Sequence, residues 1–142
     1  MPVKPIPDGY GTVTPMVLVD NPGKFLEFAR RAFTAVEIMQ LRAPDGSVAH
    51  AEINIGNSRI MVERSGGPSS AVSLYLYVTN CDELYQSALA AGAAVGQQLG
   101  DKVWGDRVGM VKDPFGNSWW IATHTEDVSP EEISRRVAAM NR

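Results

Sequence analysis

The side chains best suited to chemistry include His50 and Glu52, which stand two apart in the stretch "HAEINI". On an extended strand, residues two apart point to the same side. An imidazole beside a carboxylate can act as a general acid–base pair. The alternative is a hydrogen-bonded structural histidine, which is the more frequent role of a lone His. Neither residue implies a substrate, and both interpretations remain open.

A second stretch, "DPFGNSWWIATH", carries two adjacent tryptophans after a predicted turn. Pro114 and Gly116 are typical of a tight turn, and the apolar residues after them predict a strand. Alternation along that strand turns Trp119 and Trp120 to opposite sides. Each ring is either part of a core or the wall of a ligand pocket.

A third stretch, "DKVWGDRVG", places Trp104 and Arg107 in and beside a polar turn. Arg107 can clamp an anionic ligand with two hydrogen bonds, or it can pair with a nearby carboxylate, which is the commoner case. His50, Glu52 and His124 would form a metal site only if their strands converge.

An internal repeat indicates how these residues are positioned. Residues 17–36 align without a gap on residues 76–95, at an offset of 59. The matches include Asn21 with Asn80, each in the N-cap position of a predicted helix. Two copies of one unit are therefore expected.

Each copy reads as β-α-β-β-β, which predicts an α+β fold. Later strands are expected at about 35–42, 48–55 and 58–63 in the first copy, and at about 95–99, 107–112 and 118–123 in the second. We predict one domain over 1–142, with a first module at about 11–63, a linker at 64–70, a second module at about 71–125, and a C-terminal helix at about 129–141. The Gly, Ser and Pro residues of "RSGGPSS" define the linker.

Alternation also divides each predicted sheet into a helix side and an opposite side. Ala51, Ile53 and the apolar residues of "SLYLYV" suit the helix side. The remaining polar and aromatic side chains would line a small-molecule site. The predicted ligand-binding residues are His50, Glu52, Asn54, Tyr75, Tyr77, Trp104, Arg107 and Trp120.

Composition sets limits on the class of protein. The formal net charge is −3, with no run rich in Lys or Arg, which argues against nucleic acid or an anionic membrane as partner. No apolar run reaches the roughly 20 residues of a membrane-spanning helix. The single cysteine, Cys81, and an N-terminus without a secretory apolar segment favour a cytoplasmic protein.

The doubled unit, "HAEINIGNSRIMVE", "WGDRVGMVKDPFGNSWWIATH" and "EDVSPEEISRR" together resemble the vicinal oxygen chelate superfamily over roughly residues 11–125. This superfamily includes glyoxalase I, bleomycin-resistance proteins and extradiol dioxygenases, and the similarity is to its PhnB-like branch. The resemblance implies a cup-shaped mixed sheet holding a small ligand, and a homodimer.

The resemblance also assigns positions to the metal ligands of metal-dependent members. They fall at about Thr14, Ser73, Met61 (or Ile60, if the register slips by one) and Trp120. None is a histidine or a carboxylate, the groups that such a site requires. We therefore expect no metal at the usual position and no cofactor.

Two functions of different class follow. The first is a binding protein that holds a small organic molecule against aromatic side chains. The alternative is an enzyme, a glyoxalase-like lyase or another, that uses a relocated metal or a metal-free acid–base pair. An accessory domain that works through protein contacts is a third possibility.

Overall fold

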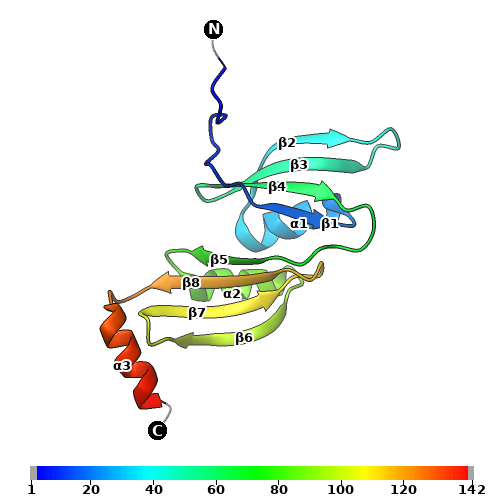
Figure 1. The fold of residues 1–142 in the computed structure, drawn as a ribbon. Helices are drawn as coiled ribbons and strands as arrows, with labels where there is room; N and C mark the ends of the chain where they lie inside the picture. The colour runs from blue at the N-terminus through cyan, green and yellow to red at the C-terminus, as the bar shows by residue number, and fades with distance from the viewer. Residues whose placement is uncertain (1–2, 141–142) are drawn as a thin grey trace. The chain divides into compact units, whose positions relative to one another are not determined.

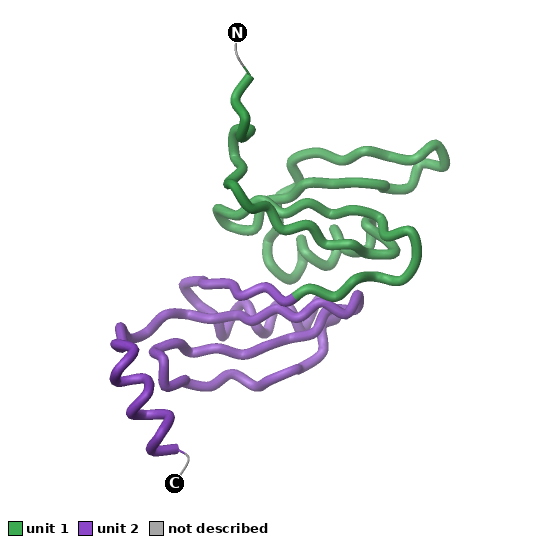
Figure 2. Tube along the Cα trace, viewed as in Figure 1, with its two compact units in different colours: residues 1–72 green, residues 73–142 purple. Residues whose placement is uncertain are grey.

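The computed structural model describes residues 3–140, and the chain divides into two compact units, residues 1–72 and 73–142 (Figure 2). Each unit contains a four-stranded mixed sheet and a helix in the order β-α-β-β-β, and a third helix ends the chain (Figure 1). The predicted α+β fold of two βαβββ modules is confirmed. That the two units make one domain stays a prediction.

The first unit is built from β1 (Met16–Val19), α1 (Pro22–Phe33), β2 (Val36–Arg42), β3 (Val48–Ile55) and β4 (Ser58–Arg64). The strand order is β1-β4-β3-β2, so β1 and β2 are the edge strands. β1 runs parallel to β4, whereas the other pairs are antiparallel.

The second unit repeats this plan with β5 (Ser73–Tyr77), α2 (Cys81–Ala90), β6 (Ala94–Asp101), β7 (Asp106–Lys112), β8 (Ser118–His124) and the extra helix α3 (Pro130–Met140). Its strand order is β5-β8-β7-β6, again with the first pair parallel. The predicted strands agree with these bounds to within a few residues. Residue 141, the predicted end of the last helix, lies outside the described residues.

The two helices begin in the same way. Asn21 Oδ1 accepts a hydrogen bond of 3.1 Å from the Lys24 backbone N–H, and Asn80 Oδ1 accepts one of 3.1 Å from Glu83. Each side chain satisfies an N–H group that the first helical turn leaves without a partner. The shared cap supports the duplication indicated by the sequence.

One face of each sheet packs against its helix and the other face is open. In the first unit Ala51 and Ile53 are buried on the helix side, as alternation predicts. In the second unit Trp119, Ile121 and Val111 are buried together with Tyr85 of α2. Trp119 is 0% exposed, so this member of the tryptophan pair is a core residue.

The "DPFGN" turn between β7 and β8 is organised by the buried carboxylate of Asp113. It accepts backbone N–H groups of Phe115 and Asn117 at 2.8 and 2.9 Å. It also accepts the indole N–H of Trp119 at 2.9 Å. Gly116 has φ = 93°, which favours glycine at this position.

Cys81, the one cysteine of the chain, is the first residue of α2. Its side chain is 2% exposed, and its backbone N–H donates to Thr123 Oγ1 at 2.9 Å. The start of α2 is thereby attached to β8. Separately, none of the helices in residues 3–140 is long and apolar enough to cross a membrane.

Candidate ligand-binding face

The open face of the second sheet gathers aromatic side chains because of strand register. Tyr75 on β5 lies opposite Trp120 on β8, and Asp106 on β7 lies opposite His124. Partners in register point to the same side of a sheet. Because Trp119 points to the helix side, these four side chains share the face that α2 does not cover.

Asp106 is the centre of this face. Its side chain is 1% exposed. Oδ2 accepts the hydroxyl of Tyr75 at 2.7 Å, the hydroxyl of Tyr77 at 2.9 Å and the indole N–H of Trp104 at 3.1 Å. Oδ1 lies 2.9 Å from Nδ1 of His124. A buried carboxylate is costly unless such donors satisfy it, and here one carboxylate fixes four rings.

The rings are arranged for stacking. Tyr75 and Trp120 are nearly parallel, with centroids 6.3 Å apart and an interplanar angle of 16°. Tyr75 and Tyr77 are tilted at a centroid distance of 5.2 Å. Tyr77 meets His124 edge-on at 6.3 Å. Tyr75, Tyr77 and Trp104 each keep a large exposed surface.

The hydrogen bonds determine the charge of the cluster. Burial acts to raise the pKa of Asp106, but donation by His124, Tyr75, Tyr77 and Trp104 outweighs it and holds that pKa below its usual value. Burial and the bond to Asp106 raise the pKa of Tyr75 to about 12. The Asp106 bond also raises the pKa of Tyr77. At neutral pH the carboxylate is therefore ionised and both phenols are neutral.

His124 lies between two carboxylates. Nδ1 contacts Asp106 as described, and Nε2 lies 2.7 Å from Oδ1 of Asp127, which is exposed. The bonds to Asp106 and Asp127 raise the pKa of His124 above 6.5. The imidazolium form is thereby favoured, and it balances part of the negative charge of the face.

Arg107 does not join this cluster. It lies one residue beyond Asp106 on β7 and so points to the helix side. Nε and Nη2 donate to the two carboxylate oxygens of Asp82 on α2, at 2.7 and 3.0 Å. The commoner of the two roles expected for Arg107, pairing with a carboxylate, is the one the structure shows.

In the first unit, His50 and Glu52 lie together on the open face, and Glu63 joins them. Nε2 of His50 is 2.9 Å from Oε2 of Glu52. Nδ1 is 2.6 Å from Oε2 of Glu63, the residue paired with His50 on β4. Both ring nitrogens therefore contact carboxylates. Asn54 is separate from them, and its Oδ1 accepts from Nε of Arg59 at 2.7 Å.

Three residues of these clusters were not among the predicted ligand-binding residues: Asp106, His124 and Glu63. A signal for Asp106 was present, because the hydroxyls of Tyr75 and Tyr77 on one strand face require partners when they are partly buried. The register that brings Asp106 to them depends on the pairing of β7 with β8, which alternation alone does not give.

The residues at the family's metal positions do not fit a metal. Ser73, Met61 and Trp120 carry no imidazole or carboxylate, and neither does Thr14. Met61 is paired with Glu52 across β3 and β4, but a thioether is a poor ligand for the divalent ions such sites hold. Within residues 3–140, no three His, Cys, Asp or Glu side chains are grouped so as to hold a metal ion.

Comparison with known proteins identifies the class to which this fold and face belong. The family model of the glyoxalase/bleomycin resistance protein/dioxygenase superfamily matches residues 12–121. The chain belongs to this superfamily. An uncharacterized protein of Mycobacterium bovis is 34% identical over 140 residues, covering 89% of this chain and 92% of the relative.

Solved structures agree with the assignment. TioX from Micromonospora sp. ML1 is 27% identical with a TM-score of 0.68, covering 79% of this chain and 98% of TioX. A gene product of Arabidopsis thaliana is 25% identical with a TM-score of 0.63, covering 82% and 99%. The PhnB protein from Bacillus cereus shares the fold at 18% identity and a TM-score of 0.61, covering 80% and 99%.

Proposed function

We propose that the chain binds a planar small organic molecule on the aromatic open face of its second unit. The observation that carries the proposal is the nearly parallel pair of Tyr75 and Trp120, in which Tyr75 is held by Asp106 together with Tyr77 and Trp104. Rings held in one orientation lose little freedom when a ligand stacks on them, which favours binding. Membership of a superfamily that includes bleomycin-resistance proteins supports the same function.

The hydrogen-bonding groups of the face support binding in preference to chemistry. All four donors to Asp106 are engaged with its carboxylate. The phenols stay neutral at ordinary pH, since the pKa of Tyr75 is about 12. What the face offers a ligand is ring surface with a few polar edges, as is common in small-molecule sites. That both units contribute to one shared cup stays a prediction.

Tryptophan fluorescence tests this function, because the three tryptophans differ in position. Trp104 and Trp120 lie on the open face, whereas Trp119 is 0% exposed in the core. We expect acridine orange or 8-anilinonaphthalene-1-sulfonate, two aromatic probes of opposite charge, to quench the emission of Trp104 and Trp120. In the double variant Trp104→Phe, Trp120→Phe, only the emission of Trp119 should remain. That emission should not respond to the probe.

Trp120→Ala measures the energy of the contact. A stacked aromatic pair contributes about 0.5–1.5 kcal/mol of binding free energy beyond the contribution of its buried area. Binding of the probe should therefore weaken by up to about tenfold while the fold persists. Tyr10→Ala is the matched control, because Tyr10 is an aromatic residue of the first unit that contacts Arg59 instead. Equal affinities of the wild type and Trp120→Ala for both probes would contradict the proposal.

A second function, metal-free proton transfer, is favoured by the environment of His50. Contacts from Glu52 and Glu63 to its two ring nitrogens fix the orientation of the ring and place carboxylates within reach of both nitrogens. This supports an enzyme that moves a proton on a small carbonyl compound. Exchange of α-protons of methylglyoxal or acetol into D2O, followed by NMR, tests it: His50→Ala should abolish any catalysed exchange and Tyr10→Ala should not.

A further inference from the structure

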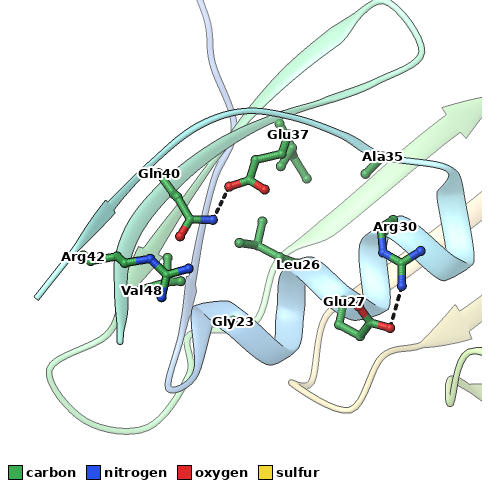
Figure 3. A pocket seen from close by; sticks show the side chains of 10 residues that line it. Gly23, Leu26, Glu27, Arg30, Ala35, Glu37, Gln40, Arg42 and Val48 are labelled. Carbon is green, nitrogen blue, oxygen red and sulfur yellow. Dashed lines mark hydrogen bonds and ion pairs between the residues drawn. The ribbon is translucent and has the colours of Figure 1, made fainter. Parts of the chain in front are cut away.

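A polar hollow of about 260 Å³ lies in the first unit between α1 and the strands β2 and β3. It lies on the helix side of the sheet, away from the open face. Figure 3 shows side chains from β2 and from α1 directed toward it. The lining residues that the argument uses are Leu26, Glu27, Arg30, Glu37, Gln40 and Arg42.

The hollow lies beside β2, an edge strand without buried residues, whose helix-side positions are polar. Glu37 and Gln40 are paired with the buried residues Ile53 and Ala51, so they lie on the helix side. The apolar residues Val36 and Leu41 instead lie on the open side and are 59% and 55% exposed. A strand selected only for packing would place its apolar residues toward the helix.

Gln40 presents an acceptor that the protein leaves unused. Its Nε2 donates to Oε1 of Glu37 (Figure 3). This bond fixes the amide, because the opposite orientation would set its oxygen against the carboxylate. Oε1 of Gln40 is then buried without a hydrogen-bond partner among residues 3–140. A buried acceptor without a donor destabilises the fold, and a bound donor would remove that penalty.

The second unit shows that the fold does not require this hollow. At the repeat offset, Leu26 corresponds to Tyr85, a buried residue of α2. The hydroxyl of Tyr85 reaches across to β6 and donates to the carbonyl oxygen of Gln97 at 3.0 Å. The second unit thus fills the gap with an aromatic ring, whereas the first leaves it open and lined by polar side chains.

The charged groups of the hollow have different partners. Glu27 is ion-paired with Arg30 at 2.7 Å. Arg42 donates to the carbonyl oxygen of Gly46, in the turn after β2, at 2.8 Å. Glu37 is bonded to the neutral amide of Gln40. The carboxylate of Glu37 and the free oxygen of Gln40 therefore form an adjacent pair of acceptors that carries negative charge.

We propose that this hollow is a binding site for the ammonium or guanidinium group of a small organic cation. Such a group supplies several N–H donors and a positive charge, which match the Glu37 carboxylate and Gln40 Oε1. The site is independent of the aromatic face proposed above. It lies on another unit and takes a ligand by charge and hydrogen bonding, not by stacking.

NMR titration of the full chain tests the proposal. Methylguanidinium and n-butylammonium are the probes, and butyrate, which would pair with Arg42 instead, is the control of opposite charge. We expect both cations to shift the side-chain amide signals of Gln40 in a saturable way at millimolar concentration. Butyrate should leave those signals unchanged.

Three variants test whether the cation is recognised by the groups that line the hollow. Gln40→Met keeps the length of the side chain but removes the acceptor, and Glu37→Gln removes the charge; each should weaken cation binding by about tenfold or more. Because Gln40→Met also removes the Gln40 amide signals, binding to the variants is followed by the backbone amide signals of residues 37–42. Leu26→Tyr copies the second unit and should eliminate binding by filling the hollow, with the fold intact. Gln98→Met, on the exposed edge strand β6, is the matched control and should bind as the wild type does.

Three results would overturn the proposal. The first is the absence of saturable shifts at Gln40 with either cation, which would leave the hollow filled by water alone. The second is binding of butyrate in place of the cations, which would assign recognition to Arg42. The third is cation binding that survives Leu26→Tyr, which would place the cation site elsewhere. None of these results bears on the aromatic face.

Discussion

Asp106 shows how one side chain can organise a surface. Four donors from two strands and a loop converge on its two oxygens, so the positions of the surrounding rings depend on a single ionised group. The carboxylate also depends on them, because burial without donors would favour its protonated form. Any change to this residue is therefore expected to alter ring geometry and histidine charge together.

The pH response of His124 can be measured directly. Its NMR titration midpoint should lie above 6.5, because bonds to Asp106 and then Asp127 raise its pKa. Since the folded-state pKa is raised, the stabilisation is complete below pH 6.5 and is lost as the pH rises through the higher folded-state value. Asp127→Asn should lower the midpoint, and Asp106→Asn should lower it further. A wild-type midpoint below 6.5 would contradict this account.

Asp113 should be important for stability. Its carboxylate accepts from Phe115, Asn117 and Trp119 in a buried turn, so Asp113→Ala leaves several buried donors without partners. We expect a loss of about 2–4 kcal/mol in the free energy of unfolding, measured by urea denaturation. Asp45→Ala is the control, because Asp45 accepts hydrogen bonds from Ser47 in an exposed turn. This substitution should lower the free energy of unfolding far less.

Among the elements, α3 is attached by polar contacts and not by a core. None of its residues is buried. Arg136 joins it to the rest of the unit by donating to the carbonyl oxygen of Val103 at 3.0 Å and to the carboxylate of Glu126 at 2.9 and 3.2 Å. The helix itself begins at a Ser129 cap, whose Oγ accepts from the Glu132 backbone N–H at 3.1 Å.

Arg136→Ala should therefore release α3 without unfolding the unit. Limited proteolysis should cut faster near residues 125–130, while the melting temperature changes little, because partly exposed ion pairs contribute less than about 1 kcal/mol. Arg135→Ala is the matched control, since the ion pair of Arg135, with Glu132, lies within the helix. Equal cleavage rates for the two variants would contradict the assignment.

Local signals in the sequence predicted most of the elements. The N-caps at Asn21 and Asn80 and the offset of 59 set the helices, and alternation assigned Trp119 and Trp120 to opposite faces correctly. The Asp106 cluster was not predicted, because it requires the register of β7 against β8 together with side-chain reach. The hollow was missed for a related reason: the pairing of β2 with β3 shifts register between Glu37 and Met39, and alternation alone does not show that Glu37 and Gln40 share the helix side.

Across the whole molecule, the two copies of the repeated unit carry different side chains on their surfaces. The second unit fills its helix–sheet gap with Tyr85 and carries aromatic residues on its open face. The first keeps a polar hollow and places the His50 cluster on its open face. The repeat thus conserves the backbone plan while the side chains on either face have diverged.

We expect a homodimer, as the family resemblance implies. The apolar side of α3 carries Val137 and Met140, both exposed, and a second copy would remove this surface from water. Light scattering should give twice the 15.4 kDa chain mass at micromolar concentration. Truncation after Val128 should shift the mass to that of one chain. A full-length protein that stays at 15.4 kDa would contradict the expectation.

The accessibility of the buried Cys81 thiol can be used to measure local opening of the second unit. Because the thiol is buried where α2 begins, a thiol reagent can modify it only in molecules in which the start of α2 has opened. The labelling rate under native conditions therefore reports the free energy of that opening. If that value equals the free energy of global unfolding, the start of α2 is exposed only when the chain unfolds. A smaller value would mean that the start of α2 opens while the rest of the chain stays folded.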